Sequence, residues 1–206
     1  SQERPRSFTT QLDRTRYARS VRSLRRQLAD EQPAACYYGA MTETQRGESG
    51  RYIRYQVADR VAHITVDRPE YRNAQSRLLL EELDEAFISA AQDPDVNVIC
   101  LLGAGDHFSA GHDLGTPDEL ADREERPWEP GIRGWYDRTW EQFYANTKRW
   151  REIPKPTVAA VQGYCIFGGW MIASAMDVIF AANNAMFLGS HFQYFCMPWD
   201  LHPRKV

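Results

Sequence analysis

The sequence has little of what marks several large classes of protein. Its 206 residues include only four cysteines, which are widely separated and form no C-x-x-C pair. The five histidines are scattered as well, so we expect neither a disulfide framework nor a metal site. No apolar run approaches the length of a membrane span, and no signal peptide opens the chain. These shortages favour a protein of a reducing, cytoplasmic setting without a membrane partner.

Charge and nucleotide-binding motifs are also in short supply. The net charge of −3 does not favour binding to nucleic acid or to an anionic surface. No G-x-G-x-x-G follows a first strand, and no Walker A motif is present, so the usual nucleotide-binding interpretations fail. The hydrophobic content of 43% and charged content of 26% are those of an ordinary globular protein, and the length suits one domain or slightly more.

Composition divides the chain near its first quarter. We expect residues 1–50 to form a basic, flexible N-terminal extension and residues 51–206 to form the core domain. Eight arginines occur before residue 41: Arg4, Arg6, Arg14, Arg16, Arg19, Arg22, Arg25 and Arg26. The extension is either a targeting or docking arm or a solvated segment. A third alternative is that Met41 is the natural start.

From residue 51 the pattern alternates between strands and helices. The expected elements are, in order, a hairpin over 51–66 turning at Asp59-Arg60, a helix over 77–92 capped by Ser76, a strand at 96–104 buried on both faces, a polar stretch at 115–134, helical spacing of aromatics over 136–150, and buried strands at 155–163 and 177–182. Strand–helix–strand units with apolar strands predict a mainly parallel α/β architecture.

Two glycine turns attract attention, "HFSAGHDL" at 107–114 and "VQGYCIFGGWMIA" at 161–173. The second opens a helix with Gly168-Gly169, although each glycine costs a helix roughly 1 kcal/mol, so something must need the bare backbone there. Either turn alone is most simply a tight corner. Together they can present backbone N–H groups that converge on one point, as in an oxyanion hole.

The run "HITVDRPEYRNAQS", then "FSAGHDL", then "KPTVAAVQGYCIFGGWMIASAMDVIFAANNAMF" resembles the crotonase superfamily, the enoyl-CoA hydratase/isomerase family, over about residues 52–206. The resemblance implies a spiral of ββα units, assembly into homotrimers or hexamers, and acyl-CoA substrates with no separate cofactor. It implies that the backbone N–H groups of His112 and Gly168 hold the thioester oxygen as it becomes an enolate. Family members continue past the point matching Val206, so the C-terminal helices of the fold are expected to be missing here.

Coenzyme A contacts follow from the same resemblance. Arg72 is a candidate for the CoA phosphates, or else a solvated surface arginine. Asn73 and Ala74 shape the turn beside it. The Ala110 carbonyl suits the adenine amino group, and Asp113 is expected to fix its loop by accepting backbone N–H bonds rather than to touch substrate.

Two positions depart from the family pattern. Family hydratases hold the reacting water between two glutamates, and the matching positions here are Met171 and His191. Methionine transfers no proton, whereas His191 titrates near neutrality and is our candidate for a single general base or acid. The candidates for a second group are Asp200, Tyr164 and Tyr194.

Three functions therefore remain open. The first is an enoyl-CoA hydratase/isomerase-like enzyme with altered chemistry. The second is a family hydrolase that cleaves a C–C bond or a thioester with His191 activating water. The third is a non-catalytic acyl-CoA-binding subunit. Aromatic residues over 128–150 suit a bulky acyl group, or simply the core.

Overall fold

The computed structural model describes residues 50–189. Its strands are β1 (Ile53–Ala58), β2 (Val61–Val66), β3 (Val98–Gly103), β4 (Thr157–Val161), β5 (Tyr164–Ile166), β6 (Val178–Ala181) and β7 (Met186–Leu188). Its helices are η2 (Pro69–Tyr71), α2 (Arg77–Gln92), α3 (Pro117–Glu125), α4 (Gly131–Thr139), the π-helical η3 (Trp140–Ala145), α5 (Asn146–Arg151) and α6 (Gly168–Ser174). None of the helices in this range is both long and apolar enough to cross a bilayer.

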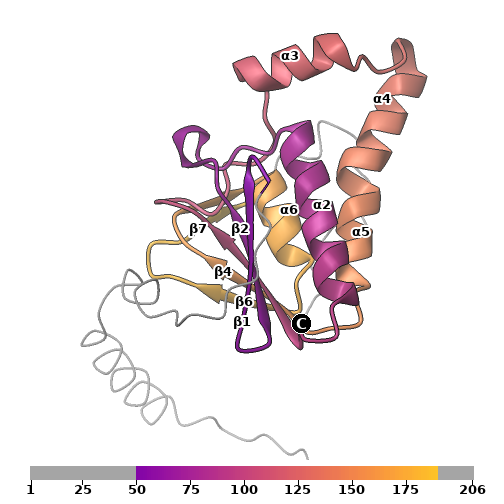
Figure 1. Ribbon diagram of the computed structural model, residues 1–206. Helices are drawn as coiled ribbons and strands as arrows, with labels where there is room; N and C mark the ends of the chain where they lie inside the picture. Colours follow the sequence, from indigo (N-terminus) through magenta and orange to yellow (C-terminus); the bar gives the residue numbers. More distant parts are fainter. Residues whose placement is uncertain (1–49, 190–206) are drawn as a thin grey trace, which may run out of the picture. The chain divides into compact units, whose positions relative to one another are not determined.

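The strands form a five-stranded sheet in the order β1-β2-β3-β4-β6 and a separate pair, β5-β7. β1 runs antiparallel to β2, and every other pairing in the two sheets is parallel. The units β1–β2–α2 and β4–β5–α6 repeat a ββα order, and α2, α5 and α6 lie along one face of the larger sheet (Figure 1). The predicted α/β class and its ββα spiral are confirmed.

Local sequence signals account for the first unit. Asp59 and Arg60 both adopt positive φ, 49° and 65°, which joins β1 and β2 by the tight turn that matches the twist of paired strands. Helix α2 begins where it was predicted, and the Ser76 hydroxyl accepts the Leu79 N–H at 3.3 Å. Asp93 ends this helix ahead of a proline.

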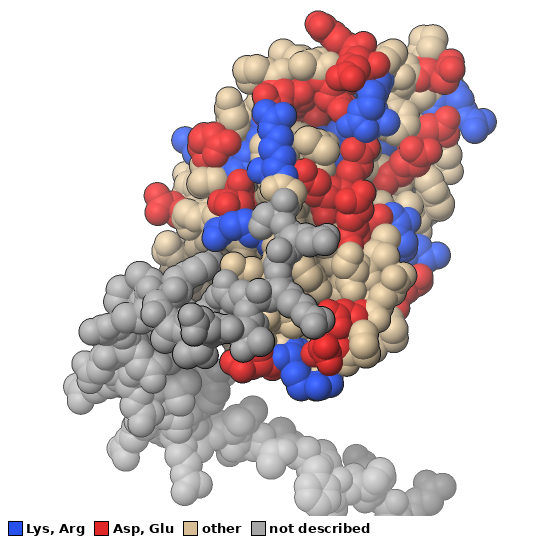
Figure 2. Space-filling view, viewed as in Figure 1, with Lys and Arg blue, Asp and Glu red and all other residues tan. Residues whose placement is uncertain are grey.

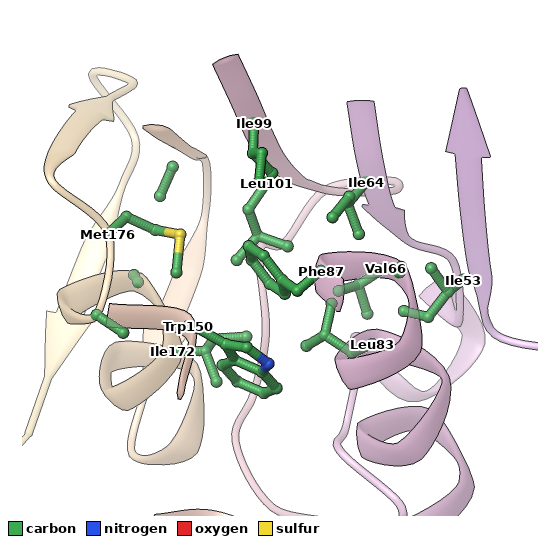
Figure 3. Close-up of a cluster of buried hydrophobic side chains, with 14 of the residues drawn as sticks. Ile53, Ile64, Val66, Leu83, Phe87, Ile99, Leu101, Trp150, Ile172 and Met176 are labelled. Atoms are coloured by element: carbon green, nitrogen blue, oxygen red, sulfur yellow. The ribbon is translucent and has the colours of Figure 1, made fainter. Parts of the chain in front are cut away.

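The core lies between α2 and the sheet. Leu83 and Phe87 lie on the side of α2 that faces the sheet, among Ile64 and Val66 of β2 and Leu101 of β3 (Figure 3), and all five side chains are fully buried. The Phe87 ring stacks on Trp150 of α5 with 5.2 Å between centroids. Because α2 presents an apolar stripe to the sheet at helical spacing, its burial holds the parallel strands together.

The polar stretch at 115–134 contains a helix that the sequence pattern did not predict. Helix α3 lacks an apolar stripe. It is stabilised instead by two ion pairs, each between residues one helical turn apart: Arg123–Glu119 at 2.8 Å and Arg126–Asp122. Figure 2 shows acidic and basic side chains interspersed over this end of the molecule. Charged pairs of this kind support a helix without leaving a hydrophobic period in the sequence.

The prediction of fully buried strands is wrong at three places. In β3 and in β4 only alternate residues are fully buried, because the helices cover one face of the sheet (Figure 1). In β6, Val178 is 46% and Phe180 66% exposed, since among residues 50–189 this strand ends the sheet and pairs with β4 alone. The predicted basic, flexible extension over residues 1–50 lies outside the described residues, which begin at Gly50.

Candidate active site

The turn at 107–114 forms backbone hydrogen bonds on both sides to other segments of the chain. On one side the Gln75 N–H donates to the Gly111 carbonyl at 2.8 Å, and the Asp113 N–H donates to the Gln75 carbonyl at 2.9 Å. On the other side the Ser109 N–H donates to Tyr164 at 2.8 Å, and its carbonyl accepts from Ile166 at 3.1 Å. The two glycine turns, far apart in sequence, are thereby brought into contact.

Glycine is required at this contact because backbone and side-chain atoms leave no room for a Cβ. Gly111 has φ +94°, and a Cβ there would lie 3.1 Å from the Gly168 nitrogen. A Cβ on Gly168 would meet Gln75 Oε1 and His112 Cδ2, both at 2.5 Å. One on Gly169 would meet the Ser109 carbonyl oxygen at 2.5 Å. What comes close to Gly168-Gly169 in this structure is the protein's own 75 and 107–114 segments, a reason for the glycines that the sequence pattern did not supply.

The residue ahead of these glycines is strained. Phe167 has φ 49° and ψ −112°, a combination that costs a residue with a side chain on the order of 1–3 kcal/mol. Its N–H donates to the Leu188 carbonyl at 2.7 Å, which ties the turn to β7. Strain of this size persists only where the surroundings impose it, and here it aims the first residues of α6 at the 107–114 turn.

The His112 side chain fills the space beside Gly168. Its ring lies 3.9 Å from the Phe143 ring, centroid to centroid, and Phe143 belongs to the π-helical η3. Burial of the imidazole, with the nearby charge of Arg138 in second place, lowers the pKa of His112 to about 4. The ring is therefore neutral at neutral pH. π-Helical segments recur at functional sites, and this one supplies an aromatic wall.

A buried ion pair fixes the far end of the same turn. Arg68 Nη1 lies 2.6 Å from Asp113 Oδ2, and both side chains are at most 1% exposed. The same guanidinium donates to the Ala74 carbonyl at 3.0 Å and to the Thr116 hydroxyl at 2.6 Å. It also lies over the Tyr71 ring, 4.5 Å from the centroid. Arg68 thus clamps the segment before α2 to the loop that follows His112.

Asp113 accepts several hydrogen bonds. Its Oδ1 takes the N–H groups of Gly115 at 2.9 Å and Thr116 at 2.8 Å, and its Oδ2 takes the Thr116 hydroxyl at 2.6 Å. Burial by itself would raise the pKa of Asp113, but the bonds from Thr116, Arg68 and Gly115 outweigh it and hold that pKa below its usual value. Hydrogen bonds within its own loop thus occupy both oxygens of the Asp113 carboxylate.

The residues expected to hold coenzyme A lie together at one edge. Arg72 is exposed, with φ 52°, and its carbonyl accepts the Ala110 N–H at 2.9 Å. Asn73 is fully buried and donates to the Ala104 carbonyl at 2.9 Å and the His107 carbonyl at 2.8 Å. Ala74 is half-buried beside them. Among the described residues the Arg72 side chain makes no hydrogen bond or ion pair, so it can meet an anion from solvent.

The structure describes only some of the residues expected at the proton-transfer positions. Met171 is 4% exposed, packed on the inner side of α6. Tyr164 stacks on the His107 ring, with 4.1 Å between centroids. His191, Asp200 and Tyr194 lie outside the described residues.

Sequence reasoning missed three residues that build this site: Gln75, Arg68 and Phe143. A polar residue in "NAQS" between a turn and a helix was the available signal for Gln75. Arg68 stands in the quoted "DRPEYR" run, but nothing local marks it as fully buried. Phe143 belongs to the aromatic helix, and only its contact with His112 separates it from the other rings.

Comparison with known proteins agrees with this arrangement. Residues 56–202 match the family described as enoyl-CoA hydratase/isomerase. A Mycobacterium tuberculosis protein named "Putative enoyl-CoA hydratase EchA13" is 38% identical over an alignment 184 residues long, which covers 79% of this chain and 58% of that protein. The mitochondrial Delta(3,5)-Delta(2,4)-dienoyl-CoA isomerase of Rattus norvegicus is 36% identical over 129 residues, 62% of this chain and 39% of that protein.

A solved structure, the probable enoyl-CoA hydratase of Mycobacterium thermoresistibile, superposes with a TM-score of 0.60 at 45% identity. That superposition covers 67% of this chain and 52% of that one. The chain thus spans about half the length of the relatives it matches. With the family match over most of its length, the protein belongs to the enoyl-CoA hydratase/isomerase family of the crotonase superfamily.

Proposed function

We propose that the protein binds an acyl-CoA thioester and stabilises the enolate oxygen formed from its carbonyl with the backbone N–H groups of His112 and Gly168. The observation that carries the proposal is the contact between the 107–114 turn and the start of α6. The Gln75 N–H donates to the Gly111 carbonyl and the Asp113 N–H donates to the Gln75 carbonyl, so the His112 N–H between them points away from Gln75. The Gly168 N–H belongs to the first turn of α6, which has no acceptor within its own helix.

The chemistry follows from where charge develops. Two fixed N–H donors favour the enolate over the neutral thioester, so removal of a proton from the carbon next to the carbonyl becomes easier. The neutral His112 ring and Phe143 keep water from that side. No reorganisation is needed, because the close packing of glycines on Gln75 and Ser109 already holds the backbone in place.

Coenzyme A would lie along the Arg72–Ala110 edge. Arg72 would meet its phosphates, and the Ala110 carbonyl would accept from the adenine amino group. Ala74 would shape the turn, and Asp113, engaged by Arg68 and its own loop, would support this edge without touching the ligand. Every relative reported above is named for a CoA ester, which supports the same ligand class. Assembly into homotrimers or hexamers belongs to the proposal.

His191 would act as the single general base or acid. Met171, buried on α6, leaves no carboxylate at the other family position, so two-glutamate water addition is not available. Hydration of a short enoyl-CoA should therefore be slow. Any efficient reaction should depend on His191 and show one ionisation near 6–7.

The direct test is ligand-dependent stability of the full chain. Acyl-CoA thioesters should raise the melting temperature by mass action, whereas NAD, ATP and DNA should not. If a nucleotide cofactor shifts the transition and millimolar acyl-CoA does not, the proposal fails. Fast crotonyl-CoA hydration that is indifferent to His191→Ala would overturn the role given to His191.

A second candidate is an acyl-CoA-binding subunit without turnover. The specific observation in its favour is Met171, a buried thioether at a position where the chemistry needs a proton carrier. If the protein binds both straight-chain enoyl-CoAs and ring-bearing acyl-CoAs but turns over none of them, the result would favour this second candidate. Turnover of a diketone or thioester, abolished by His191→Ala, would instead favour a hydrolase.

A further inference from the structure

Ser109 lies at the centre of the turn that carries one of the proposed donors. The residue is fully buried, and its hydroxyl makes three hydrogen bonds. Oγ donates to the Asn73 carbonyl at 2.7 Å and accepts from Gln75 Nε2 and from the Gly111 N–H, both at 3.2 Å. A hydroxyl has one proton and two lone pairs, so this one is fully used inside the protein. It ties the segment before α2 to the residue that precedes His112.

The bond to Gly111 helps to decide where the His112 N–H points. Gly111 has φ +94° and no side chain, so its own torsional preferences do little to hold the turn. Its N–H is held by the Ser109 hydroxyl, and its carbonyl accepts the Gln75 N–H at 2.8 Å. The His112 N–H belongs to the same planar peptide group as that carbonyl and points the opposite way. With the peptide groups on both sides of Gly111 anchored, the direction of the His112 N–H is set.

The backbone of Ser109 holds the side of the site that carries the second donor. Its N–H donates to the Tyr164 carbonyl at 2.8 Å, and its carbonyl accepts the Ile166 N–H at 3.1 Å. Both partners belong to β5, the strand that precedes Gly168 at the start of α6. The Ser109 carbonyl oxygen also lies 2.5 Å from where a Cβ of Gly169 would be. Ser109 therefore contacts both sides of the proposed oxyanion hole.

We propose that the Ser109 hydroxyl is a positioning group that keeps the His112 N–H aimed at the thioester oxygen. This inference rests on the proposed function. Ser109 is buried behind the turn and acts through Gly111 rather than on the ligand. A donor that is aimed wrongly still lets the neutral thioester bind, but it stabilises the charge of the enolate less well. The hydroxyl should therefore affect rate more than affinity.

The experiment follows, by NMR in heavy water, how the full chain exchanges the α-protons of butyryl-CoA for deuterium. In this reaction a base removes the α-proton, the C–H electron pair shifts to give the enolate oxygen, and a deuteron from solvent returns to the carbon. Ser109→Ala should lower the maximal exchange rate about 10- to 100-fold, whereas the half-saturating concentration should change less than about threefold. Ser109→Cys, which keeps a weak donor and acceptor, should fall between Ser109→Ala and wild type.

Ser76→Ala is the matched control. Ser76 is also buried, and its hydroxyl accepts the Leu79 N–H at 3.3 Å. This variant should lose stability and keep its exchange rate. A loss of exchange in Ser109→Ala but not in Ser76→Ala separates positioning of the donor from a general loosening of the fold.

The carbonyl stretch of bound butyryl-CoA, labelled isotopically at the thioester carbon, reports on the same donors without turnover. Two aimed N–H groups should lower its infrared frequency relative to the free ester, and Ser109→Ala should reverse part of that shift. If the wild-type chain binds the ester but exchanges no proton, this frequency decides.

A wild-type exchange rate and carbonyl frequency in folded Ser109→Ala, or a loss confined to the half-saturating concentration, would overturn the inference and leave the proposed function standing. Failure of the wild-type chain to bind butyryl-CoA would overturn both. If Ser109→Ala does not fold, Ser109→Cys decides, and a wild-type exchange rate in that variant would overturn the role of the hydroxyl.

Discussion

Helices α2 and α6 both follow strands of a ββα unit, but they begin in opposite ways. Helix α2 runs for 16 residues, and the Ser76 hydroxyl accepts one of its first N–H groups. Helix α6 has seven residues, starts with two glycines, and follows Phe167, which is strained and makes no side-chain cap bond. The start of α2 follows rules of helix stability. The start of α6 breaks them.

The surroundings of the two helix starts explain the difference. The segment leading into α2 is held by the buried Arg68–Asp113 pair, so strong polar contacts fix its geometry. The start of α6 is held by close packing of Gly168 and Gly169 on Gln75, His112 and Ser109. We therefore expect the contacts on the α2 side to contribute most to the free energy of unfolding, whereas the backbone N–H donors proposed for chemistry lie on the α6 side. Each of the following changes tests that division.

The largest effect is expected at Arg68. Arg68→Ala leaves Asp113 buried and unpaired, which should lower the free energy of unfolding by about 3–5 kcal/mol. Urea denaturation measures this. Arg126→Ala is the matched control, because its guanidinium is 40% exposed and its pairs with Glu81, at 3.0 Å, and with Asp122 should each be worth at most about 1 kcal/mol. Equal losses in the two variants would refute the clamp.

At the start of α6 the effect should appear in rate. Gly168→Ala adds a Cβ against Gln75 and His112 but keeps the N–H, whereas Gly168→Pro adds similar bulk and removes the donor. Turnover of Gly168→Pro should fall about 10²- to 10³-fold below that of Gly168→Ala, the usual effect of losing one oxyanion donor. Circular dichroism must show both variants folded. Identical rates would exclude Gly168 as a donor.

The buried imidazole on the α6 side should make stability depend on pH. The pKa of His112 is about 4 in the folded protein and about 6.5 when unfolded, so the unfolded chain binds the extra proton between these values. Stability should therefore fall as pH drops from 6.5 toward 4, by about 3 kcal/mol in all.

His112→Asn should remove most of this slope in denaturation measured across that range. The pKa of His63 is also lowered by burial, although Asp59 opposes the shift, so His63→Asn serves as the control for its share. The depressed pKa of Asp113 acts at lower pH, where its stabilisation is lost as pH falls through the folded value. An unchanged slope in His112→Asn would show that its ring is not buried in solution.

The smallest effect is expected at the cap of α2. Ser76→Ala removes the acceptor for the Leu79 N–H and should cost about 1 kcal/mol of stability. Thermal or urea unfolding measures it. Turnover and acyl-CoA affinity should stay at wild-type values, because within residues 50–189 the Ser76 hydroxyl bonds only to the Leu79 N–H. A change in catalysis without a change in stability would contradict the division between the two helices.

Local patterns were sufficient for the hairpin, for α2 and for the alternation of strands and helices along the chain. The Asp59-Arg60 turn and the Ser76 cap depend on neighbours within a few residues, and so does the apolar stripe that includes Leu83 and Phe87. The same reasoning failed at α3, where ion pairs replace the apolar stripe, and at β6, where exposure depends on its place at the end of the sheet.

By itself the sequence determined where the two glycine turns lie, and its resemblance to the family predicted that His112 and Gly168 act together. Only the tertiary structure decided what those glycines touch. Gln75 reaches Gly168 because the 107–114 turn lies between the segment before α2 and β5, bonded to both. The burial of the Arg68 and Gln75 side chains is a consequence of the same docking. Such contacts depend on how distant segments pack, and no period or spacing along the chain records them.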